Sequence, residues 1–225
     1  MEPFVDVLDY LAGTPALVGP ILAALIIFLT SDWRLALGAL FAQYVLVGLA
    51  LTRYIRPEVA VVKVLVGVIV VLILYITARR AQEMMRPWGE EDNTPRFPSF
   101  HLGWRGGALG LPLRLLCVLV VGLALVRLFQ DYQSTIVPAE IALVACWLGG
   151  MGMIGLVLGG DPLRVATALL TIFTGFDLVY ASLEPSLAIA GFLAAFALLV
   201  ALAFSYLAIM QGLYLSEIEP EEIER

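Results

Sequence analysis

The sequence predicts an all-α, polytopic membrane protein with about seven transmembrane helices, and three observations support this fold class. First, 61% of the 225 residues are hydrophobic and only 14% are charged, whereas about a quarter of the residues in soluble domains are charged. Second, apolar runs of roughly 20 residues, the length that crosses a bilayer, recur along the chain. Third, the runs are separated by turn-forming sequences such as SDWR (31–34), GGDP (159–162) and LEPS (183–186).

Three predicted transmembrane helices occupy the N-terminal part, residues 1–78, at 14–30, 35–54 and 58–78. Pro20 lies inside the first helix, where neighbouring groups in a membrane bundle can satisfy the carbonyl that a proline leaves free. Gln43 and Tyr44 lie near the middle of the second helix, and the third contains Lys63.

A polar segment, residues 79–112, follows these helices and is rich in proline, glycine and charge. It predicts a loop that joins the three-helix part to a four-helix part at 113–210. The four helices are expected at 113–129, 138–159, 164–182 and 186–210. Residues 211–225 form an acidic tail.

The arginines predict the orientation of these helices. With the N-terminus outside, the inner side carries nine arginines and the outer side three (Arg53, Arg56 and Arg127). Because basic residues favour the cytoplasmic side, the loop 79–112 and the tail 211–225 are expected in the cytoplasm. The localisation that follows is the inner (plasma) membrane of a cell, crossed several times.

Residues that usually carry redox or metal chemistry are sparse. The only histidine, His101, lies in the polar loop, and Cys117 and Cys146 belong to no CxxC pair. No nucleotide-binding motif or Ser–His–Asp set is present. A single histidine excludes a bis-histidine haem site and disfavours a histidine-rich metal site, which leaves carboxylates, hydroxyls, water and one ammonium group for any chemistry. We expect no metal, no catalytic residue and no nucleic-acid partner.

That ammonium belongs to Lys63, the only lysine in the chain, inside an apolar run. In the predicted topology Lys63 and Asp177 each lie about five residues, or roughly 7–8 Å, below the outer boundary. Glu140 begins its helix on the same side at a shallower depth. These groups are the candidates for ion coupling, because a charge inside a membrane is expensive and often functional. A purely structural ion pair and a lysine that reaches the interface remain open alternatives.

A polar stripe leads to Asp177 along its helix. Thr167, Thr171 and Thr174 share one helix face with Asp177, and Arg164 begins the same helix. Such hydroxyls either support a chain of water molecules or bond to carbonyls of their own helix. Both interpretations are kept, with Thr171, Thr174 and Arg164 among the ion-coupling candidates.

Glycines favour close packing of the helix expected at 138–159. Gly152, Gly155 and Gly159 lie at i, i+3 and i+7, which leaves one face with almost no side chains. Small residues at such spacing let two membrane helices approach closely. This face is expected to contact another helix, in this chain or in a partner.

Two segments resemble one known family. DWRLALGALFAQYVLVGLA and PEVAVVKVLVGVIVVLILYITARR are similar to the N-terminal half of the hydrogenase-4 membrane component E family, which also has a lysine in its third helix. The stretch from DPLRVATALLTIFTGFDLVYAS onward is similar to its C-terminal half, which is related to the NuoK-type subunit of complex I. The last three helices are accordingly expected to be NuoK-like.

The resemblance implies a subunit of a complex-I-like or hydrogenase-type membrane arm. Such subunits hold no redox cofactor and assemble with antiporter-like and other membrane subunits. NuoK-type proteins carry a membrane glutamate in each of two helices. This chain departs from that pattern, because Phe173 stands near the expected acid, Asp177 follows one turn later, and the last span has no acid.

These observations favour a non-catalytic subunit of a proton- or ion-translocating redox assembly, with a buried polar site that serves ion coupling or packing. A stand-alone small transporter is the alternative from another class. A purely structural assembly subunit of another membrane complex is the third interpretation.

Overall fold

The computed structural model describes residues 14–30, 32–52, 57–84, 110–130, 136–184 and 186–223. Within these ranges all regular secondary structure is helical. The helices are α2 (Thr14–Leu29), α3 (Trp33–Thr52), α4 (Pro57–Met84), α5 (Gly110–Phe129), α6 (Ala139–Leu158), α7 (Pro162–Leu183) and α8 (Leu187–Ile223).

The predicted fold class is confirmed. Each expected apolar run corresponds to one helix, and six helices of the described residues are long and apolar enough to cross a membrane. The remaining helix, α2, is apolar but shorter, with 16 residues. The chain is therefore a multi-pass helical membrane protein.

Some helices extend beyond the predicted boundaries into polar sequence. α4 continues to Met84, where an ion pair between Arg79 Nε and Glu83 Oε1 (3.3 Å) links successive turns. α5 begins at Gly110, inside the predicted loop, and α8 continues to Ile223 through most of the predicted tail. Residues 85–109 of the loop lie outside the described residues.

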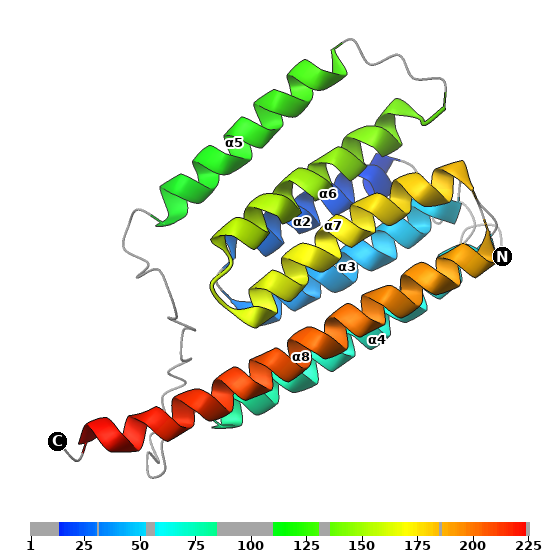
Figure 1. Ribbon diagram of the computed structural model, residues 1–225. Helices are drawn as coiled ribbons and strands as arrows, with labels where there is room; N and C mark the ends of the chain where they lie inside the picture. Colours follow the sequence, from blue (N-terminus) through cyan, green and yellow to red (C-terminus); the bar gives the residue numbers. More distant parts are fainter. Residues whose placement is uncertain are drawn as a thin grey trace.

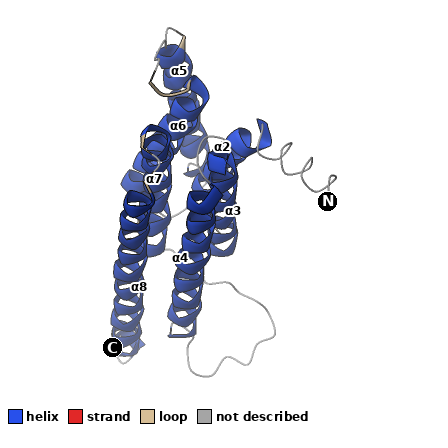
Figure 2. Ribbon diagram, turned by 90° about the vertical axis from the view of Figure 1, so that its right-hand side faces the viewer, coloured by secondary structure: helices blue, strands red, loops and turns tan. Residues whose placement is uncertain are grey.

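The helices form two layers of three, with α5 beside them (Figures 1 and 2). The first layer is α2, α3 and α4, and the second is α6, α7 and α8. α2 lies against α6, α3 against α7, and α4 against α8, so each helix of one layer has a counterpart in the other. α5 packs along α6, with a smaller contact to α2.

Apolar side chains between the layers form the core. Leu40 and Tyr44 of α3 join Val70 and Leu74 of α4 and Leu170 of α7 in one buried cluster. A second cluster forms at α2, α3, α6 and α7, and its fully buried members include Val47, Leu51, Ile141, Val144 and Leu148. The indole Nε1 of Trp147 donates a hydrogen bond to the Ile21 carbonyl oxygen (3.2 Å), which ties α6 to α2.

The glycine face of α6 packs against α7, as the glycine spacing predicts. A Cβ added at Gly152 would lie 2.5 Å from Ile172 Cγ1, and one at Gly155 would lie 3.0 Å from Ala168 Cβ. At Gly159 the nearest side-chain atom would be Val165 Cγ2, also at 3.0 Å. The missing side chains allow the two helices to approach closely.

Candidate functional site

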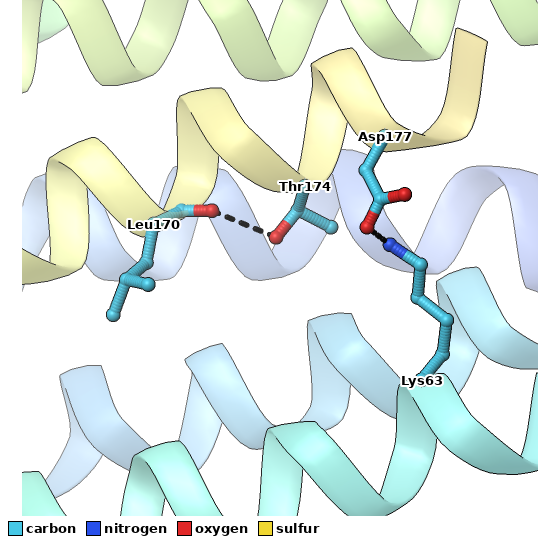
Figure 3. Close-up of polar contacts among 4 residues, drawn as sticks. All are labelled: Lys63, Leu170, Thr174 and Asp177. Carbon is cyan, nitrogen blue, oxygen red and sulfur yellow. Dashed lines mark hydrogen bonds and ion pairs between the residues drawn. The ribbon is translucent and has the colours of Figure 1, made fainter. Parts of the chain in front are cut away.

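Lys63 and Asp177 form an ion pair between the two layers of helices. The Lys63 side chain extends from α4, and its Nζ pairs with Oδ2 of Asp177 on α7 (Figure 3). Both side chains face the interior, with 6% of Lys63 and 14% of Asp177 exposed. The two charges that the sequence places at one depth are therefore in direct contact, and of the two open alternatives the structure shows the ion pair.

The environment of the pair is mainly apolar. A small cavity of about 10 Å³ borders it and is lined by Val62, Val66 and Phe173 among others, besides Lys63 and Asp177 themselves. This volume corresponds to about one water molecule. Because little solvent can reach the pair, each charge depends on the other for compensation.

Two polar side chains lie beside the pair. Tyr44 on α3 and Thr174 on α7 line the same cavity. Thr174 also donates its hydroxyl hydrogen to the Leu170 carbonyl oxygen at 2.7 Å (Figure 3). Sequence reasoning placed Tyr44 near the middle of its helix but assigned it no role, since nothing in one helix indicates which residues of another lie opposite.

The threonine stripe of α7 bonds to its own helix. Thr167 donates to the Arg164 carbonyl oxygen (2.9 Å), and Thr171 to that of Thr167 (2.8 Å). Together with the Thr174 bond, these contacts show the second of the two interpretations, in which the hydroxyls bond to carbonyls of their own helix. The hydroxyl hydrogens are therefore engaged within the helix and do not link one threonine side chain to the next.

Glu140 and Arg164 are not brought to the pair. Glu140 is exposed in the first turn of α6. Arg164 lies thirteen residues before Asp177 on α7, which is about 20 Å along a helix axis. Its guanidinium donates instead to the Thr30 carbonyl oxygen at 3.4 Å.

Gln43, next to Tyr44 on α3, is a buried polar residue that sequence reasoning noted without a role. Its side chain is fully buried, and within the described residues neither its amide nitrogen nor its amide oxygen has a hydrogen-bond partner. In the sequence, the only sign of this buried polar group is an amide in the middle of an apolar helix.

The site offers acid–base chemistry. Among the described residues, no three histidine, cysteine, aspartate or glutamate side chains are grouped so that they could hold a metal ion. An ammonium against a carboxylate can exist as a charged pair, or as a neutral pair after the proton moves from Nζ to Oδ2. The arrangement can therefore hold or exchange one proton between the two helix layers.

No family model, curated protein or solved structure matches this chain.

Proposed function

We propose that this multi-pass membrane protein is a non-catalytic subunit of a proton- or ion-translocating redox assembly of the complex-I-like or hydrogenase type. The observation that carries the proposal is the buried Lys63–Asp177 pair between α4 and α7. The resemblance of the lysine helix and of the α7–α8 sequence to membrane-arm subunits supports the same role. Its partners in this proposal are antiporter-like and other membrane subunits.

The pair would couple its own protonation state to the packing between the two helix layers. When Asp177 accepts a proton, Lys63 is left as an unpaired ammonium among apolar neighbours, which is strongly unfavourable. The system then regains stability if Lys63 loses its proton or if α4 shifts relative to α7. If a change in charge in a neighbouring subunit altered the protonation of the pair, the packing between the two layers would change with it.

This role differs from that of a channel. The threonine hydroxyls of α7 donate to carbonyls of their own helix, and the cavity at the pair has room for about one water molecule. These features support a coupling element rather than a continuous proton wire through this chain. Proton conduction itself would belong to the partner subunits.

The decisive experiment is purification of the tagged chain in mild detergent, followed by identification of its partners. Co-purification of antiporter-like and iron–sulfur subunits is expected.

Proton pumping by inverted membrane vesicles should then fall in Lys63→Met and in Asp177→Leu. Glu140→Gln serves as the control, because it changes an exposed carboxylate that lies away from the pair.

The double variant separates the coupling role from a packing role. If the pair serves packing only, Lys63→Met/Asp177→Leu should restore both assembly and pumping. If the groups carry charge during turnover, assembly recovers but pumping stays lost. A chain that purifies alone and transports a solute in proteoliposomes would contradict the proposal and support the transporter alternative.

A further inference from the structure

Two arginines meet at one end of the bundle, away from the Lys63–Asp177 pair. Arg114, near the start of α5, donates from Nη1 to the Leu29 carbonyl oxygen at 3.2 Å. Arg164, in the first turn of α7, donates from Nη2 to the next carbonyl oxygen, that of Thr30. Both side chains are half-buried, and the two guanidinium groups repel each other electrostatically.

Among the described residues, neither guanidinium group forms a salt bridge with a carboxylate. Each guanidinium has five N–H donors, of which one is engaged with the end of α2. Bonding to the Leu29 and Thr30 carbonyls therefore explains where the arginines lie, but within the described residues it leaves most of their N–H donors without a partner and neither charge with a counter-ion.

A cavity opens between the same helices. Its volume is about 40 Å³, and both arginines line it together with Phe28 of α2, Leu158 of α6 and the glycine face at Gly152 and Gly155. Its lining therefore changes from charged at the helix ends to apolar within the bundle. This order matches a phospholipid, with its phosphate at the boundary and its acyl chain in the hydrocarbon.

We propose that Arg114 and Arg164 bind the phosphate of an anionic phospholipid, in the leaflet that faces this end of the bundle. One phosphate between the two guanidinium groups would accept several charge-assisted hydrogen bonds and relieve their mutual repulsion. The glycine face and Phe28 would border the start of an acyl chain. The lipid would in this way join α5, which otherwise packs mainly on α6, to α2 and α7.

Native mass spectrometry of the delipidated protein tests the proposal. The protein is titrated with phosphatidylglycerol and, separately, with zwitterionic phosphatidylcholine. Phosphatidylglycerol should bind more tightly, and Arg114→Gln/Arg164→Gln should weaken it roughly 30-fold, because each basic group near a membrane surface contributes about a factor of five. The glutamine amides can still donate to the α2 carbonyls, which favours folding of the variant.

Arg127→Gln is the matched control, since it removes an exposed arginine from the other end of α5. It should leave the affinity for phosphatidylglycerol unchanged. Equal affinities for the two lipids in the wild-type protein would overturn the proposal without any variant. So would a double variant, folded by circular dichroism, that binds phosphatidylglycerol as tightly as the wild type does.

The source of the phosphate is tested by competition. Inorganic phosphate at 100-fold excess over phosphatidylglycerol should not displace the lipid, because it gains nothing from the apolar part of the cavity. Displacement that depends on the two arginines would instead assign the site to a free anion and refute the lipid version. Should the glutamine variant fail to fold, Arg114→Lys/Arg164→Lys keeps both charges and should retain selectivity for phosphatidylglycerol.

Discussion

At the scale of single residues, a lysine is tolerated in the apolar interior because a carboxylate from another helix lies against it. Lys63 and Asp177 come from different layers, so each compensates the charge that the other layer buries. Tyr44 and Thr174 line the small cavity beside them. The stability of the contact between α4 and α7 is therefore tied to the charge state of two side chains.

Removing one partner of the pair should destabilise the protein more than removing both. We expect Lys63→Met and Asp177→Leu each to lower the free energy of unfolding in detergent micelles by about 3–5 kcal/mol, because each leaves an uncompensated buried charge. The double variant should lose much less. Denaturant titration followed by circular dichroism measures this cycle, and additive losses in the double variant would exclude direct coupling between the two residues.

Gln43 presents the opposite case, a buried amide without a hydrogen-bond partner among the described residues. Gln43→Met keeps the volume and removes the unpaired polar atoms, so it should raise the free energy of unfolding by about 1 kcal/mol. Thr174→Val is the comparison, since it removes a hydroxyl that is bonded to the Leu170 carbonyl and should lower stability by about 1 kcal/mol. A clear loss of stability in Gln43→Met would mean that the amide has a partner such as water.

At the scale of helices, the close contact between α6 and α7 depends on glycines of both helices. Gly152 and Gly155 on α6 meet Ile172 and Ala168 of α7. Gly175 on α7 makes the reciprocal approach, with the Ala145 carbonyl oxygen 2.9 Å from an added Cβ. Gly175 was not singled out in the sequence, because it is an isolated glycine with no second one at helical spacing on its helix.

Substitutions at two glycines of α6 should have opposite effects. Gly149 has open space around an added Cβ, so Gly149→Ala should stabilise the helix by roughly 0.5–1 kcal/mol. Gly152→Ala should instead destabilise the protein by about 1–3 kcal/mol, because its Cβ would overlap Ile172 and the Ala168 carbonyl. Gly155→Leu should disrupt packing further.

Thermal unfolding of these three variants in one detergent provides the measurement. The helix propensity gained on replacing glycine by alanine is the same at positions 149 and 152, so the difference between those two variants isolates the contact with α7. Equal stability of Gly149→Ala and Gly152→Ala would contradict close packing at the glycine face.

At the scale of the whole molecule, the N-terminal and C-terminal helix triplets form the two layers, while α5 lies at their edge. Large apolar side chains are exposed along α5, among them Leu116, Leu119 and Leu123. In a membrane protein such a surface faces lipid or another membrane protein. The arrangement leaves the Lys63–Asp177 pair at the inner contact of the layers, away from this surface.

The orientation in the membrane stays a prediction from the arginines, and cysteine labelling tests it. In a background with Cys117 and Cys146 replaced by alanine, Asn93→Cys should be protected from a membrane-impermeant maleimide in intact cells. Glu140→Cys, at the exposed start of α6, should be labelled. Labelling of Asn93→Cys from outside would reverse the predicted topology. Asn93 lies outside the described residues.

The sequence by itself determined the membrane class, the helices of the described residues and most of their boundaries, because the length of an apolar run and the turn residues after it are local properties. It also identified Lys63 and Asp177 as charges that need compensation, since both lie inside apolar runs long enough to cross a membrane.

Only the tertiary structure decided which helices are neighbours and which polar groups meet. In a membrane the helices are apolar on nearly every side, so hydrophobic periodicity does not tell a buried face from one exposed to lipid. Depth along the helix placed Lys63 and Asp177 at one level, but the layered packing brought them together with Tyr44. The same packing left Glu140 exposed and placed Arg164 beside Arg114 at the opposite end of α7, because neighbours across helices follow from shape complementarity along the whole bundle.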